Sequence, residues 1–196
     1  MIKFSLLWVC RYKTKKDMKE YLYSDLEPFD CHRIFPCFDQ PNLKGYFELS
    51  LITPEEWVTL SNSQEEENQM EILSEAFNFE EKLKIENEYE SILIGQHEIK
   101  NKKYKFHKFK KTPKIPLYVF GICAGAYYNL KCPFPSDIPL NLYLRENVKP
   151  EENIDEIFRI IIEGIKWFSE YFGFNFPFDK MDLVCCPDFK GKFIKK

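Results

Sequence analysis

The chain has 196 residues, 44% of them hydrophobic and 30% charged, a composition typical of a soluble globular protein with one or two domains. Its net charge of −3 argues against a nucleic-acid partner, because such binding usually comes with a strong basic excess. No run approaches the ~20 apolar residues that span a membrane, so no membrane partner is predicted either.

The first 146 residues are predicted to be rich in β-strands, beginning with a buried strand within residues 1–10. Residues 44–52 alternate between apolar and polar side chains, which predicts a half-buried strand that Pro54 ends, and a second strand follows over residues 57–60. Residues 64–90 are acidic and rich in Asn, and they are predicted to form a solvated insertion, either partly helical or disordered. The apolar run over 115–128 is expected in the core, and residues 140–145 alternate again.

The periodicity then changes from that of a strand to that of a helix. Apolar residues recur at spacings of three and four, which predicts a helix of about five turns from Ile154 to Phe172, with Gly173 as its stop. A last strand is predicted over residues 181–186. The predicted fold is therefore mainly β with a C-terminal α/β piece.

The seven cysteines show no regular framework, and they are predicted to be reduced thiols of a cytoplasmic protein. Cys31, Cys37, Cys185 and Cys186 are expected to be small buried side chains rather than nucleophiles. Of the three histidines, His32 is expected to be packed and hydrogen-bonded, and His97 is assigned to a polar turn. No catalytic residue and no metal ligand is predicted.

Three stretches resemble motifs of the aminopeptidase N and puromycin-sensitive aminopeptidase family of zinc metallopeptidases (gluzincins), and they occur in the family's order. Residues 21–41 (YLYSDLEPFDCHRIFPCFDQP) resemble its Tyr-x-Tyr-Thr-Gln-x-Glu-Pro and Phe-Pro-Cys-Phe-Asp-Glu-Pro hallmark. Residues 112–127 are similar to its Thr-Pro-x-Ile-Ser-Thr-Tyr and Ala-Gly-x-Tyr stretch. Residues 171–189 resemble its Phe-Gly-x-x-Tyr-Pro-x-x-Lys-x-Asp stretch and the Pro-Asp/Glu-Phe that follows.

The resemblance implies a fold and a site. Residues 1–146 would be part of an N-terminal antiparallel β-sandwich or saddle domain, and residues 147–196 the truncated start of a thermolysin-like catalytic domain. In that family zinc is held by a His-Glu-x-x-His motif and a later Glu, and the saddle lends a Gln and a Glu that hold the substrate's free amino group. The matching positions are Asp25, where the family has Gln, and Glu27, so both are predicted to bind the N-terminus of a peptide substrate.

The chain lacks His-Glu-x-x-His and the Gly-Ala-Met-Glu-Asn strand, so no cofactor is predicted here although the full-length family carries zinc. We expect a fragment of a zinc aminopeptidase that is inactive alone, either an incomplete gene product or one piece of a split enzyme. The missing catalytic domain or a partner chain would cover the 154–172 helix. The alternatives are a non-catalytic peptide-binding or interaction module derived from the saddle, and a degenerate product without function.

Overall fold

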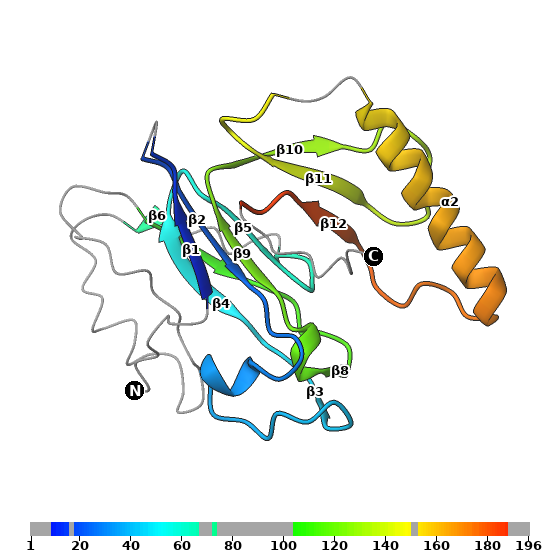
Figure 1. Ribbon diagram of the computed structural model, residues 1–196, viewed down its shortest axis with the longest axis horizontal. Helices are drawn as coiled ribbons and strands as arrows, with labels where there is room; N and C mark the ends of the chain where they lie inside the picture. The colour runs from blue at the N-terminus through cyan, green and yellow to red at the C-terminus, as the bar shows by residue number, and fades with distance from the viewer. Residues whose placement is uncertain (1–8, 16–17, 67–71, 74–103, 150–152, 188–196) are drawn as a thin grey trace, which may run out of the picture. The chain divides into compact units, whose positions relative to one another are not determined.

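The structure is a computed structural model that describes residues 9–15, 18–66, 72–73, 104–149 and 153–187 (Figure 1). Two compact units divide the chain, one of residues 1–11 and 22–125 and one of residues 12–21 and 126–196, and each is described by itself. Strands predominate, and α2 (Ile154–Phe172) is the single α-helix of the described residues, so the predicted mainly β fold is confirmed. The predicted domain boundary at residues 146/147 refers to family domains and stays a prediction.

Three sheets are built mainly from the first unit. A four-stranded sheet has the order β1 (Val9–Lys13), β2 (Glu20–Ser24), β9 (Ile122–Gly125) and β5 (Val58–Ser61). A three-stranded antiparallel sheet has the order β4 (Ser50–Pro54), β7 (Tyr104–Lys108) and β6 (Ile72–Leu73). The short strands β3 (Lys44–Gly45) and β8 (Ile115–Pro116) form an antiparallel pair. Strand β6 shows that part of the predicted insertion over residues 64–90 joins a sheet.

The strand predicted over residues 44–52 is divided into two pieces. Its alternation is visible in burial, because Leu49 and Leu51 are buried while Glu48 is exposed. Between β3 and β4, however, the backbone pairs with a loop: the Phe47 N–H donates to Thr112 Oγ1 and the Thr112 N–H donates to the Phe47 carbonyl, both at 2.9 Å. Pro54 is the last residue of β4, so the prediction that it ends the strand is confirmed to within one residue.

Apolar side chains from the loops and strands of the first unit form one core cluster. The Phe47 and Phe120 rings stack at 4.3 Å, and Phe35 packs edge-on against both. The buried members of the cluster are Leu26, Cys31, Ile34, Leu49, Leu51, Phe109, Phe120 and Ile122. Burial of this aromatic and aliphatic surface is the main force that orders the irregular segments around it.

The apolar run over residues 115–128 lies largely in the core as predicted, but it is not one strand. It contains β8, the 3-10 helix η2 (Leu117–Val119), β9 and the start of β10 (Tyr127–Lys131). The Asn62 side chain holds the turn before β9, since its Oδ1 accepts the Gly121 N–H at 2.7 Å and its Nδ2 donates to the Val119 carbonyl at 2.9 Å. Gly125, the last residue of β9, has a φ of +155°, and Ala126 alone separates β9 from β10.

The second unit contains a β-α-β arrangement. Strand β11 (Leu140–Arg145) pairs antiparallel with β10 and parallel with β12 (Met181–Val184), and α2 connects β11 to β12. Leu140, Leu142 and Leu144 point to one face, where they pack with Phe158 of the helix. The predicted alternation over residues 140–145 and the final strand are therefore confirmed.

Helix α2 has the bounds that the sequence predicts. Gly173 adopts the left-handed conformation with a φ of +63°, which a residue without a Cβ reaches at little cost. Its N–H donates to the Glu170 carbonyl and the Phe174 N–H donates to the Ser169 carbonyl, a Schellman ending. In the part of the chain that the structure describes, no helix has the length and hydrophobicity needed to cross a membrane.

Candidate functional site

The two predicted site residues lie on the segment that follows β2. The Ser24 hydroxyl accepts the Ile122 N–H at 2.9 Å, which ties the end of β2 to β9. The Leu26 side chain is 2% exposed in the core cluster, whereas Asp25 and Glu27 on either side of it are exposed. The alternation of an extended chain explains this pattern, since a buried residue directs its neighbours toward solvent.

A short turn continues from these residues into the 3-10 helix η1 (Cys31–Arg33). The Asp30 N–H donates to the Leu26 carbonyl at 3.0 Å, and the Arg33 guanidinium pairs with the Asp30 carboxylate at 3.1 Å. The predicted site is thus held by backbone hydrogen bonds and by a buried leucine, while its two carboxylates remain outside the core.

Neither carboxylate of the predicted site is neutralised by a residue that the structure describes. Within the described ranges, Asp25 and Glu27 have no basic residue in ion-pair distance. Two unpaired negative charges on one short segment attract a cation, and an ammonium group is the cation that also donates three hydrogen bonds. The segment is therefore chemically suited to hold an amino group, and it supplies no nucleophile.

The hallmark stretch around residues 31–39 is tied together by Asp39. Its Oδ2 accepts the His32 backbone N–H at 2.9 Å and lies 3.0 Å from the His32 Nδ1. His32 is hydrogen-bonded, as expected, but it is exposed rather than packed. Cys31 is buried as expected, whereas Cys37 and Cys186 are only half-buried. Cys185, in contrast, is exposed, because it follows the last residue of β12 at the end of the sheet.

The thiols of Cys31 and Cys37 are not activated. Burial raises the pKa of the Cys31 thiol well above its ordinary range, and the neighbouring Cys37 and Asp39 raise it further. Burial also raises the pKa of Cys37, as does Asp39. Because the thiolate is the reactive form, these protonated thiols are poor nucleophiles, which agrees with a role in packing.

Sequence reasoning missed a buried polar network around His107. His107 is 2% exposed, its Nδ1 lies 2.9 Å from Glu65 Oε1, and its Nε2 lies 3.0 Å from Thr53 Oγ1 and 3.3 Å from Thr59 Oγ1. The order carboxylate, imidazole, hydroxyl is that of an activated nucleophile. Both hydroxyls are buried, however, so a substrate has no access and the network is structural.

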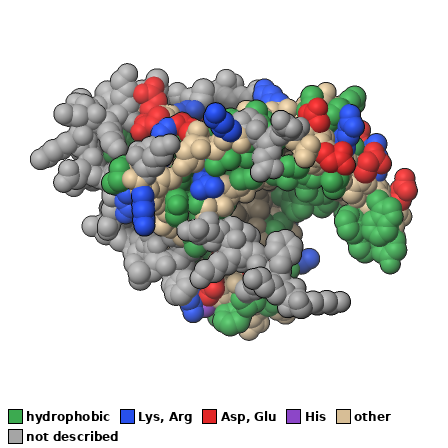
Figure 2. Space-filling view, turned by 45° about the horizontal axis from the view of Figure 1, so that its top comes forward, with side chains coloured by type: hydrophobic (Ala, Val, Ile, Leu, Met, Phe, Trp, Pro, Cys, Tyr) green, Lys and Arg blue, Asp and Glu red, His purple; other side chains and the backbone are tan. Residues whose placement is uncertain are grey.

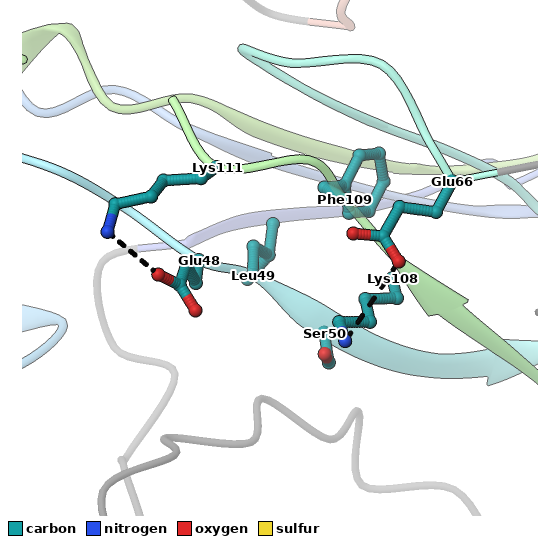
Figure 3. A pocket seen from close by; sticks show the side chains of 7 residues that line it. All are labelled: Glu48, Leu49, Ser50, Glu66, Lys108, Phe109 and Lys111. Carbon is teal, nitrogen blue, oxygen red and sulfur yellow. Dashed lines mark ion pairs between the residues drawn. The ribbon is translucent and has the colours of Figure 1, made fainter. Parts of the chain in front are cut away.

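A small cavity lies beside β4 and β7, in the first unit (Figure 3). Its volume is about 220 Å³, and its lining includes two ion pairs, Lys111 with Glu48 at 3.1 Å and Lys108 with Glu66 at 3.9 Å. The other lining residues are Leu49, Ser50 and Phe109. Since each charge has a partner of opposite sign, the cavity has no excess charge with which to select a ligand.

The residues of the described ranges do not fit a zinc site. No group of three or more His, Cys, Asp or Glu side chains among them is arranged to hold a metal ion. His32 and His107 are each engaged by one carboxylate, and they lie in different networks. His97, for which the sequence predicts a polar turn, lies outside the described residues.

Comparison with known proteins points to one family. Residues 7–89 match the family model of the Peptidase M1 N-terminal domain. The chain is 28% identical to aminopeptidase N of Streptomyces lividans over 184 residues. This alignment covers 92% of this chain and 18% of that protein. It is 28% identical to aminopeptidase 2 of Candida albicans over 184 residues, and 24% identical to glutamyl aminopeptidase of Mus musculus over 178 residues. These two alignments cover 92% and 91% of this chain and 16% of each relative. The chain thus spans less than a fifth of each of these proteins.

Proposed function

Because the chain belongs to the M1 aminopeptidase family, we propose that it supplies the substrate-anchoring part of a zinc-dependent aminopeptidase, an enzyme that removes N-terminal residues from peptides. The observation that carries the proposal is the pair of exposed carboxylates after β2. Asp25 and Glu27 occupy the positions of the family's amine-binding residues, and no basic side chain of the described ranges neutralises them.

Glu27 is the principal anchor in this proposal. Its carboxylate accepts hydrogen bonds from the α-ammonium of the peptide, and the rigid support from Leu26 fixes where that ammonium lies. Asp25 is one methylene shorter than the glutamine of the family, but its charge adds attraction that an amide would not supply. Together the two residues would select peptides with a free N-terminus.

In this proposal, residues outside this sequence bind the zinc and activate the water molecule. When bound, the metal supplies Lewis-acid activation of water and of the scissile carbonyl. The missing catalytic domain or a partner chain provides its ligands and covers α2. The chain alone is therefore inactive, and we further propose a cytoplasmic location, because its seven free cysteines suit a reducing compartment.

Binding of a short peptide with a free N-terminus, followed by NMR, tests the anchor. The same peptide with an acetylated N-terminus should bind about fivefold more weakly, since an exposed ion pair contributes up to ~1 kcal/mol. Glu27→Gln should reduce this difference, and Asp25→Asn/Glu27→Gln should remove it. Glu55→Gln, which changes an exposed carboxylate in the turn after β4, is the matched control and should preserve it. Equal binding of both peptides by the unaltered chain would contradict the anchor.

An activity assay tests the second half of the proposal. The purified chain should not release N-terminal residues from a peptide, with or without added zinc. Hydrolysis that a chelator abolishes would show that this chain carries its own metal site, and the proposal would then be wrong.

A non-catalytic interaction module is the second candidate, and the exposed apolar side chains of α2 favour it. The native mass of the protein, captured from its source, separates the two. A mass several times the 23.6 kDa of this chain, with aminopeptidase activity, supports the enzyme, and a mass of 23.6 kDa without a partner chain supports the module.

A further inference from the structure

Two free cysteines of the first unit lie in contact with each other. Cys31 begins the 3-10 helix η1 and is 0% exposed, and Cys37 follows in the loop after η1. Cys31 is a member of the core cluster, and Cys37 packs against that cluster. A hydrogen bond joins the two side chains directly. The first unit therefore holds two reduced sulfur atoms side by side.

The backbone of the loop explains how the two cysteines meet. The Phe35 N–H donates to the Cys31 carbonyl at 3.2 Å, which turns the chain after η1. The His32 N–H donates to Asp39 Oδ2 at 2.9 Å, which brings the returning chain back beside the residue that follows Cys31. Cys37 lies on this returning part. Hydrogen bonds within residues 31–39 thus fix the contact between the two thiols.

The contact suits a covalent bond between the two sulfur atoms. A disulfide forms only where the two side chains point toward each other, and a hydrogen bond between the thiols already places them so. Rotation of the Cys37 side chain, which is only half-buried, can then bring its sulfur to the bonding distance of about 2 Å. No rearrangement of the core cluster is required.

The two thiols differ in access and in chemistry. Cys31 is closed off from solvent, whereas an oxidant in solution can reach the half-buried Cys37. Burial and Asp39 raise the pKa of the Cys37 thiol, and the hydrogen bond with Cys31 opposes them. The Cys31 S–H therefore donates to the Cys37 sulfur and supports its thiolate. Cys37 is the thiol that reacts first, and Cys31 is the one that follows.

We propose that Cys31 and Cys37 are a redox pair, which a low-molecular-weight disulfide such as oxidised glutathione converts to an intrachain disulfide. The Cys37 thiolate attacks one sulfur of the oxidant, the S–S bond of the oxidant breaks, and the first glutathione leaves and takes up a proton. Cys31 then loses its proton to solvent and attacks the Cys37 sulfur, which releases the second glutathione. Two thiols of the chain are oxidised, and one oxidant molecule is reduced to two thiols.

Proximity drives this reaction, since neither thiol is activated. The raised pKa values make the first step slow, so both thiols stay reduced in a reducing compartment. Once formed, the disulfide keeps closed the loop that follows Asp25 and Glu27. It also fixes Cys31 within the cluster that contains Leu26. The cross-link favours the folded chain, because it restricts the unfolded chain and joins groups that the fold already places in contact.

The test equilibrates the full chain in glutathione buffers with an increasing share of the oxidised form. Free thiols are then blocked with an alkylating reagent, and the cysteines are mapped by mass spectrometry after digestion with trypsin. Trypsin cleaves after Arg33, so Cys31 and Cys37 lie on different peptides that only a disulfide joins. We expect this to be the first disulfide that forms. Its effective concentration should be about fiftyfold higher in the folded chain than in urea.

Three variants test the order of the two steps. Cys31→Ala should stop the reaction at a mixed disulfide between Cys37 and glutathione. Cys37→Ala should leave Cys31 unmodified in the folded chain, because Cys31 is buried. Cys132→Ala, which changes a half-buried cysteine of the second unit, is the matched control and should form the disulfide as before. Circular dichroism shows that each variant is folded, and mapping of the unaltered chain tests the proposal without any substitution.

Several results would overturn the inference. A mixed disulfide at Cys37 of the unaltered chain that never passes to Cys31 would mean that the two sulfurs do not reach bonding distance. Equal effective concentrations in the folded chain and in urea would mean that the fold does not position the pair. Oxidation of Cys185 and Cys186 while Cys31 and Cys37 stay reduced would assign the redox chemistry to the other unit.

Discussion

The Asp39 carboxylate binds His32 at two points, the backbone N–H at 2.9 Å and the ring Nδ1 at 3.0 Å. Asp39 is 9% exposed by side chain, whereas His32 is 45% exposed. The pair therefore joins an exposed imidazole to a sheltered carboxylate, and it closes the loop over residues 32–39, which contains Cys37. The loop follows directly after the proposed anchor segment.

Removing this carboxylate should destabilise the first unit more than removing the histidine. Asp39→Ala loses both hydrogen bonds and leaves the His32 N–H without its acceptor, so we expect the free energy of unfolding to fall by ~1–3 kcal/mol. His32→Ala keeps the backbone hydrogen bond and should cost less than ~1 kcal/mol. Urea unfolding of the two variants measures the difference, and equal losses would show that the backbone hydrogen bond contributes little.

The network around His107 should be a strong determinant of stability. His107→Ala leaves a cavity and deprives the buried Thr53 and Thr59 hydroxyls of a partner, so we expect a loss of ~2–4 kcal/mol. Glu65→Gln should cost less, because its side chain is 31% exposed and the amide still offers an acceptor. If chemical denaturation gives His107→Ala a loss below 1 kcal/mol (~one hydrogen bond), the network is not a structural centre.

The same substitution should have opposite effects at two glycines of the second unit. Gly164→Ala lies within α2 and meets no neighbour among the described residues, so it should stabilise the chain by up to ~1 kcal/mol through helix propensity. Gly173→Ala forces a Cβ into a φ of +63° and should destabilise it by ~1 kcal/mol. Thermal unfolding should place the two variants on opposite sides of the unaltered chain, and a shift of the same sign would contradict the helix ending described here.

Stability should fall at alkaline pH because of Cys31. Burial raises the pKa of its thiol above the ordinary value of 9.0, so the unfolded chain loses a proton that the folded chain retains. The unfolded state then binds fewer protons, and the free energy of unfolding falls by up to ~1.4 kcal/mol per pH unit above that value. The stability is fully present below pH 9.0. Cys31→Ala should reduce this slope in urea unfolding at several pH values, and an unchanged slope would assign it to other groups.

The secondary structure of the second unit could be predicted because each of its elements has one clear spacing of apolar residues, either that of a helix or that of a strand. Helix α2 and the alternation of Leu140, Leu142 and Leu144 depend on local spacing alone, and Gly173 marks the helix end by its conformational freedom. The break in the strand after Gly45 could not be predicted, because it depends on hydrogen bonds between Phe47 and Thr112, 65 residues apart.

In the first unit, the residues of the candidate site could be predicted from the sequence, whereas those of the buried polar network could not. A motif identifies Asp25 and Glu27, and the alternation around a leucine is enough to expect their exposure. The His107 network was not predictable, since its partners Thr53, Thr59 and Glu65 are 54, 48 and 42 residues away in the sequence and meet it only in the folded chain. The division of α2 into a covered and an exposed apolar face (Figure 2) was not predictable either, because its apolar residues form one broad arc in the sequence and only the packing on the sheet shows which of them are covered.

The parallel pairing of β11 with β12 also constrains the order in which the second unit folds. Leu140 lies opposite Met181, so this register has to close a long loop, at an entropic cost that a hairpin does not incur. Helix α2 lies within that loop, and its formation shortens the path that the remaining chain has to search. We therefore expect α2 to form before the two strands meet. Gly164→Ala should then accelerate refolding in stopped-flow measurements and leave the unfolding rate nearly unchanged.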